Sequence, residues 1–284
     1  MSKVAIVSDS THCLPADLVK ELNIHVAPVG MVIGGKNYAD TELTNNEFWK
    51  LFYQVNGQVT TNAANIGDFV NMFNELAKTT DSIVCIIVSK GVSASQEAAH
   101  QATEIVRSEH PDLNIEIIDS KTSGGALGFI VLEAARAAER EESLEEVVRV
   151  AQDMVTRVKF LLGMETLKYL MRGGRAPKAA GYVGQLMQVK PIIGFVSGSG
   201  LVDSLGRVRG SKKCLLKLAD MIKEYADTSK PINLMVHYTD GRAVGEELKE
   251  IITSQLECNE VYLTPLTPVM CCHTGPVAAI SFYS

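Results

Sequence analysis

The stretch DSIVCIIVSKGVSASQEAAHQATEIVRSEHPDLNIEIIDS, residues 81–120, decides the fold class. It opens and closes on apolar runs, IVCIIV at 83–88 and LNIEII at 113–118. Between them, the apolar residues recur at helical spacing. Near-continuous apolar runs are typical of parallel strands that are buried on both faces, and the helix between them completes a βαβ unit. This stretch therefore predicts an α/β architecture.

The flanking sequence extends this pattern and then changes character. Before residue 81, we predict strands in 3–10 and 24–33 and helices in 15–24 and 66–77, and the pattern is helical from 123 to about 158. Beyond it we predict strands at 158–164, 231–238, 260–264 and 277–283, a hairpin in 190–210, and helices at 166–174, 211–226 and 242–256. The expected fold is an N-terminal α/β domain on a parallel sheet, residues 1–157, and a C-terminal α+β domain with antiparallel elements, residues 158–284.

Composition and charge exclude several classes of function. The net charge is −6 and no basic stripe is present, so we expect no nucleic-acid partner. No apolar run approaches the ~20 residues of a membrane helix, and the N-terminus lacks a signal-peptide pattern, which predicts a cytoplasmic protein without stable membrane insertion. The six cysteines are mostly scattered, which is typical of reduced thiols.

Hydroxyl side chains gather where the predicted strands end. They occur in SDST (8–11), VTTNAAN (59–65), SKGVSAS (89–95) and DSKTSGG (119–125). Ligands of open α/β sheets bind beyond the carboxyl ends of the strands. Each group could also be a simple helix cap, which is the commoner role for any one of them.

The segment VMCCHTGPVAAI, 269–280, allows three chemical interpretations. A metal site is disfavoured, because adjacent Cys271 and Cys272 would point to opposite sides of an extended segment. His273 could activate Ser93 as a nucleophile, but no G-x-S-x-G elbow is present. His273 with Thr274 could instead donate to an anion, or His273 could be an ordinary core histidine. We expect no metal and no cofactor.

Two basic segments stand at predicted turns. The first holds Arg172, Arg175 and Lys178, and the second, GRVRG at 206–210, holds Arg207 and Arg209. Such residues are usually solvated surface, although arginines at turns can also meet a phosphate or a partner protein. Periodicity does not choose between these roles.

Taken together, these segments resemble one known family. VAIVSDSTHCLP, ELNIHVAPVGMVIGGKNYAD, ETLKYLMRGGRAPKAAGYVGQLMQVKPII, GRVRG and CCHTGPVAAI occur in the order found in the DegV family, from about residue 3 to about 282. The resemblance implies an N-terminal α/β and a C-terminal α+β domain with a long-chain fatty acid between them. It also implies a carrier without chemistry of its own, which presents the acid to a separate kinase subunit that forms an acyl phosphate.

The resemblance also implies roles for single residues. Thr61, Ser93 and His273, with Thr274, would hold the carboxylate. Arg209 would work with the kinase, and Arg172 and Arg175 would face that partner or a phosphate. Departures from the family pattern at Asn62–Asn65, at Ala94 and at Val277 affect the geometry around the carboxylate and the choice of ligand.

Physical chemistry supports a carrier on separate grounds. A buried carboxylate needs several donors, and a long acyl tail gains on the order of 10 kcal/mol by burial before losses. With only 6% aromatic residues, we expect an aliphatic tail wall, to which Met164, Met171 and Met187 could adapt. Two alternatives remain: a serine hydrolase that uses Ser93 and His273 on an acyl substrate, and a binding module for another apolar carboxylate.

Overall fold

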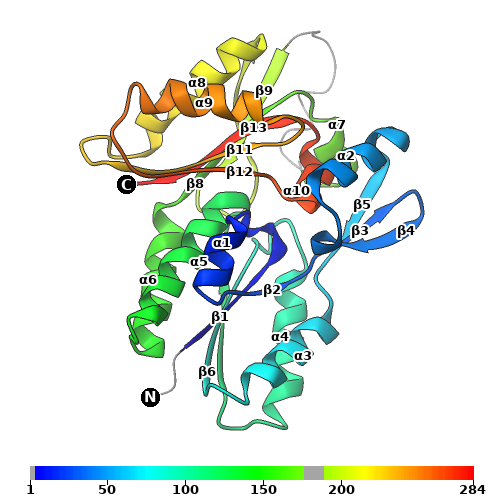
Figure 1. Ribbon diagram of the computed structural model, residues 1–284, viewed down its shortest axis with the longest axis vertical. Coiled ribbons are helices and arrows are strands. Elements are labelled where there is room, and N and C mark those ends of the chain that lie inside the picture. The colour runs from blue at the N-terminus through cyan, green and yellow to red at the C-terminus, as the bar shows by residue number, and fades with distance from the viewer. Residues whose placement is uncertain (1–3, 176–188) are drawn as a thin grey trace.

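The computed structural model describes residues 4–175 and 189–284 and arranges their strands in three sheets (Figure 1). The first, here called the parallel sheet, has the strand order β2-β1-β6-β7, and all of its described pairings are parallel. Its strands are β1 (Ala5–Asp9), β2 (His25–Ala27), β6 (Ser82–Ile87) and β7 (Asn114–Asp119). Every residue of β6 is buried, as its continuous apolar run predicts.

Helices cover both faces of the parallel sheet. One pair, α3 (Ile66–Leu76) and α4 (Ser95–Arg107), packs on one side, and α5 (Gly124–Glu139) and α6 (Leu144–Arg157) pack on the other (Figure 1). Two of them have a polar N-cap: for α3 the Asn65 side chain accepts the N–H of Gly67, and for α6 Ser143 accepts the N–H of Glu146. The predicted βαβ unit of residues 81–120 is therefore confirmed.

The second sheet, called the mixed sheet, has the order β10-β9-β8-β13-β11-β12, in which only β11 and β12 run parallel among the described pairings. Its strands are β8 (Lys159–Met164), β9 (Val189–Phe195), β10 (Asp203–Arg209), β11 (Ile232–Tyr238), β12 (Cys258–Pro265) and β13 (Val277–Tyr283). Helices α8 (Ser211–Tyr225) and α9 (Arg242–Thr253) cover one face, and α5 contacts the other (Figure 1). The predicted fold class, including this mixed C-terminal sheet, is confirmed.

The third sheet was not predicted. It is small and antiparallel, with the order β4-β3-β5, and consists of β3 (Gly30–Ile33), β4 (Lys36–Ala39) and β5 (Val59–Asn62). The single strand predicted at 24–33 is wrong, because β2 and β3 belong to different sheets. Pro28 lies between them and lacks an N–H, and the N–H of Val29 donates to Ser10 Oγ rather than to the backbone of a neighbouring strand. The strand pairing is therefore interrupted at these two residues.

The remaining elements are short or lie at the edges of the sheets. They are the 3₁₀ helices η1 (Ser10–His12) and η2 (Asp40–Glu42), and the α-helices α1 (Ala16–Glu21), α2 (Asn45–Gln54), α7 (Lys168–Arg172) and α10 (Pro268–Thr274). The helix α10 corrects the extended segment expected for residues 269–274. Thr267 has the extended backbone of an N-cap and Pro268 occupies the first turn, where its missing N–H costs nothing.

Helix α5 connects the two large sheets. It contacts β1 and β6 of the parallel sheet and β8 and β13 of the mixed sheet. Thirteen of its 16 residues are buried, as expected for a helix that is apolar on all sides. One buried cluster accordingly runs from the parallel sheet to the mixed sheet, and the division into domains at residue 157 stays a prediction.

Within the described residues, every helix is too short or too polar to cross a bilayer.

Candidate functional site

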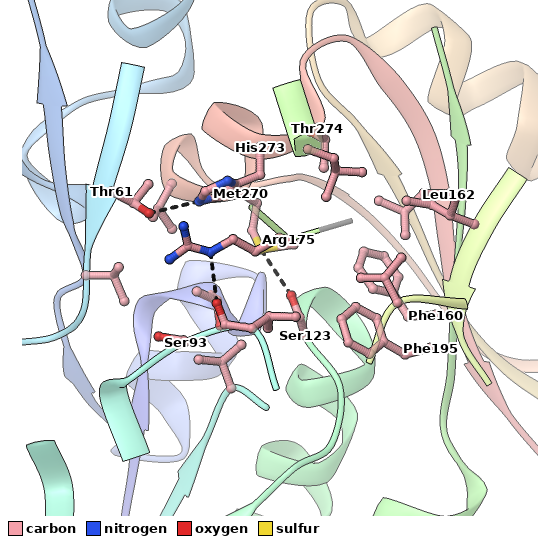
Figure 2. A pocket seen from close by; sticks show the side chains of 18 of the residues that line it. Thr61, Ser93, Ser123, Phe160, Leu162, Arg175, Phe195, Met270, His273 and Thr274 are labelled. Carbon is pink, nitrogen blue, oxygen red and sulfur yellow. Dashed lines mark hydrogen bonds between the residues drawn. The ribbon is translucent and has the colours of Figure 1, made fainter. Parts of the chain in front are cut away.

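A cavity of about 90 Å³, here called the central cavity, lies where the three sheets approach one another. Segments that follow β1, β6 and β7 supply Thr11, Ser93 and Ser123, so the cavity stands at the carboxyl ends of the parallel strands. Most of the other lining residues come from β5, β8, β9, α7 with the segment after it, and α10. Most of the lining side chains are apolar, and Thr61, Ser93, Arg175 and His273 lie together at one end (Figure 2).

That polar end brings together Thr61, Ser93 and His273, three residues that are far apart in the sequence (Figure 2). Thr61 Oγ1 lies 2.8 Å from His273 Nε2. Ser93 Oγ lies 3.0 Å from the hydroxyl of Ser95 and accepts the N–H of that residue at 3.2 Å. The first turn of α4 therefore fixes Ser93, while β5 and α10 fix Thr61 and His273.

His273 is held as a neutral imidazole. Burial, followed by the positive charges of Arg175 and Arg172, lowers its pKa to about 4. Its Nδ1 is buried and has no hydrogen-bond partner among the described residues. The backbone of Gly173 packs directly against Nδ1, where a Cβ would collide with the ring. A neutral ring offers one N–H, and its other nitrogen accepts.

The N-terminus of α10 is anchored by Asp40, which the sequence analysis missed. Asp40 is buried, and its Oδ1 accepts the N–H of Val269 at 2.7 Å. The two residues are 229 positions apart in the sequence. An acceptor at this end also suits the helix dipole. Burial raises the pKa of Asp40 to about 7. The contact therefore positions the helix that carries His273.

Thr274 lines the cavity, but its hydroxyl is already engaged. Thr274 is 3% exposed, and Oγ1 donates to the carbonyl of Gly275 at 2.9 Å. Its oxygen can still accept a hydrogen bond, whereas its one proton is used. Thr61 and Ser93 are therefore better placed than Thr274 to donate to an anion.

The three arginines singled out by the sequence occupy different places. Arg175 lines the central cavity, where Nε donates to the carbonyl of Val92 at 3.0 Å and Nη1 donates to the carbonyl of Gly173. It is the one permanently charged side chain among the described lining residues, and Figure 2 shows its guanidinium between Thr61 and Ser93. Arg172 is exposed and stands over the Tyr169 ring, 5.5 Å from its centre. Arg209 is exposed at the end of β10.

The apolar wall differs from the expected one. Met164 is buried and Met171 half-buried, yet neither lines the central cavity, and Met187 lies outside the described residues. Met270 lines it instead, and its sulfur accepts the hydroxyl of Ser123 at 3.1 Å. Met270 stands three positions before His273 on α10, on the same face, and this helix was not predicted.

Aromatic rings also enter the wall, against the expectation of an aliphatic one. Phe160 of β8 and Phe195 of β9 line the cavity, with their ring centres 6.4 Å apart and an interplanar angle of 9°. They are partners in the β8–β9 register, and buried phenylalanines in strands are most often simple core residues. A count of aromatic residues in the whole chain gave no indication of where they would lie.

The site offers little support for metal binding or covalent chemistry. The thiols of Cys271 and Cys272 are buried on α10, and burial raises the pKa of both, which keeps them protonated. In residues 4–175 and 189–284, no group of three or more His, Cys, Asp or Glu side chains could hold a metal ion. His273 Nε2 bonds to Thr61 rather than Ser93, so a nucleophile–base pair is not assembled.

Comparison with known proteins shows the family of the chain. A family model described as "Uncharacterised protein, DegV family" matches residues 3–284. The chain belongs to the DegV family. A DegV domain-containing protein of Caldanaerobacter subterraneus is 30% identical over 284 residues, covering 100% of this chain and 99% of the relative.

Solved structures of the family share the fold. A DegV family protein from Thermus thermophilus, whose structure is described as showing fatty acid binding, superposes with a TM-score of 0.90 at 26% identity over 100% of both chains. DegV of Bacillus subtilis, described as a fatty acid binding protein, gives a TM-score of 0.88 at 26% identity, over 100% of this chain and 99% of the other. These DegV neighbours bind fatty acids.

Proposed function

We propose that this DegV-family chain binds a long-chain fatty acid in the central cavity, with the carboxylate at Thr61, Ser93 and His273. One observation carries the proposal: three hydrogen-bonding side chains from distant segments, with Arg175 beside them, meet at one end of a mainly apolar cavity. A carboxylate taken out of water needs such donors. The fatty acid binding described for the two superposed DegV structures supports the same ligand.

Each polar group has a separate role in this proposal. Thr61 and Ser93 each have a hydroxyl proton to donate. Because Nδ1 of His273 packs against Gly173, the N–H that the neutral ring contributes is that of Nε2, which contacts Thr61 in the empty site. Arg175 supplies the positive charge that compensates the carboxylate within a low-dielectric site. The apolar lining provides most of the affinity, at about 0.8 kcal/mol for each methylene that it buries. Much of this gain is offset by the lost freedom of the bound acid.

Extraction of the purified protein tests the proposal directly. Gentle purification, solvent extraction and mass spectrometry should recover about one fatty acid per chain, and delipidated protein should take up added palmitate or oleate. Absence of both stoichiometric lipid and uptake would reject fatty acid binding. A competition series with other apolar carboxylates separates it from a binding module for a different acid. The altered segment Asn62–Asn65 keeps that alternative open, since Asn62 and Ala63 line the cavity.

A serine hydrolase acting through Ser93 and His273 is the second candidate, and the bond between His273 and Thr61 speaks against it. A fluorophosphonate probe decides between the two. Labelling of the protein that disappears in Ser93→Ala would favour the hydrolase, and unlabelled, folded protein would favour the carrier.

The finer part of the proposal concerns a partner. We propose that the chain presents its bound acid to a separate kinase subunit, without catalysing a reaction itself, and that exposed Arg209 contacts this subunit. Purified chain loaded with fatty acid, an ATP-dependent kinase subunit of the same organism and ATP should together form an acyl phosphate. The cytoplasmic location remains a prediction of the sequence analysis.

A further inference from the structure

Phe195 separates the central cavity from a second pocket. It lines the central cavity, and it also lines a pocket of about 280 Å³, here called the outer pocket. Among the described residues, it is the only one that lines both. Phe195 is 8% exposed, so this one buried residue stands as the wall at which the two spaces meet.

This wall stands at the end of the cavity where the tail of a fatty acid would lie. Figure 2 shows Phe160 and Phe195 across the cavity from Thr61 and Ser93. An acid whose carboxylate meets Thr61, Ser93 and His273 would therefore point its methyl end toward these two rings.

The two rings differ in their freedom to change. Phe160 is fully buried, and a Cβ added at Gly124 would come within 2.6 Å of its ring. The imidazole of His237 meets Phe160 edge-on, with ring centres 5.9 Å apart. Away from the cavity, Phe160 is thus held by the core, whereas Phe195 borders a pocket in two directions. Removing the ring of Phe195 joins the two pockets, and removing that of Phe160 leaves a hole in the core.

The outer pocket is less apolar than the central cavity, because polar side chains stand among its valines. Its lining includes Lys121, Thr122 and Lys159. Thr122 is 3% exposed, and its hydroxyl lacks a hydrogen-bond partner among the described residues. Lys159 Nζ donates to the carbonyls of Thr156 and Val158 at 3.1 and 3.3 Å. A tail that passed Phe195 would meet these polar groups as well as apolar wall, so each further methylene would gain less there than in the central cavity.

We propose that Phe195 is the residue that sets the longest acyl chain the cavity accepts, by closing the tail end against the outer pocket. This inference rests on the proposed fatty acid function. Affinity should rise about fourfold with each added methylene while the tail still finds apolar wall. It should stop rising at the length whose terminal methyl reaches the Phe195 ring, and fall beyond it as the chain must bend.

The test is a length series of saturated acids from decanoate to docosanoate, measured by displacement of a fluorescent fatty acid. It compares the full-length protein with Phe195→Ala and Phe195→Leu. The matched control is Ile193→Ala, because Ile193 stands two residues earlier on the same face of β9 and lines the central cavity but not the outer pocket. Thermal melting of each lipid-free variant checks folding.

We expect the length of tightest binding to move to longer acids in Phe195→Ala, to move less in Phe195→Leu, and to stay unchanged in Ile193→Ala. An unchanged optimum in both Phe195 variants overturns the inference, and so does an equal shift in Ile193→Ala. Loss of binding at every length in folded Phe195 variants would also overturn it, because the ring would then be needed for binding as such. If the unaltered protein takes up no acid of any length, the proposed function itself fails.

Discussion

Replacing His273 by alanine tests the carboxylate site. In the loaded protein, His273 would donate one hydrogen bond to a charged oxygen. Losing this bond costs about 1.5–3 kcal/mol in a buried site. Part of this is offset, because the variant also loses the contact between Nε2 and Thr61 at 2.8 Å when empty. We therefore expect His273→Ala to weaken fatty acid binding by roughly 1–3 kcal/mol, or about 5- to 150-fold in Kd.

The ester of the same acid is the decisive control. Palmitate and its methyl ester share a tail, but the ester has no charged oxygen. If His273 acts on the carboxylate, His273→Ala should cost palmitate the full amount and cost the ester little. Both ligands can be measured by displacement of one fluorescent fatty acid, on protein shown by melting to be folded.

Two results would refute this reasoning. An equal loss for palmitate and its ester would mean that the imidazole acts only by packing. Unchanged palmitate affinity would mean that His273 does not contact the ligand. The pH dependence adds a check, because a pKa of about 4 keeps the empty-state imidazole neutral at pH 7. The cost of the substitution should then hardly change between about pH 6 and 8.

Three further outcomes are expected. Gly173→Ala should push the imidazole away and weaken fatty acid binding. In the double variant with His273→Ala, the Gly173 substitution should add little further loss, which a double-mutant cycle in fatty acid affinity measures. Fully additive losses would show that Gly173 does not act through His273. Asp40 holds its proton up to about pH 7 when folded but releases it near pH 3.8 when unfolded, so the stability from this group is complete below about pH 3.8 and is lost as pH rises toward 7. Asp40→Asn, which keeps an acceptor for Val269, should remove that decline in urea unfolding, and parallel curves for both proteins would contradict it. Arg209→Ala should leave fatty acid affinity within about twofold but impair acyl phosphate formation with the kinase subunit; loss of lipid binding would reverse the assigned roles.

The parallel sheet could be predicted because its signals are local and repeated. β6 is a continuous apolar run that is buried on both faces, and a helical segment separates it from β7, which lies at the edge of the sheet and alternates exposed with partly buried residues. The hairpin of β9 and β10 was likewise signalled by its Gly-Ser turn. The split between β2 and β3 was missed, because the apolar residues on both sides of Pro28 form one uninterrupted run.

The site was harder to predict, because distant contacts build it. Helix α10 is seven residues long, too short for a periodic pattern, and its first turn depends on Asp40 of the distant 3₁₀ helix η2. The place of Thr61, Ser93 and His273 came from the family resemblance rather than from their spacing. Nothing local distinguishes Phe195, which faces two pockets, from any other buried phenylalanine of a strand.

A crystal structure of the protein loaded with palmitate tests the central claim most directly. We expect continuous density for the acid in the central cavity, with its carboxylate oxygens within hydrogen-bond distance of Thr61, Ser93 and His273 and its methyl end at Phe195. Density in the opposite orientation, or an acid bound elsewhere while this cavity stays closed, would contradict the account.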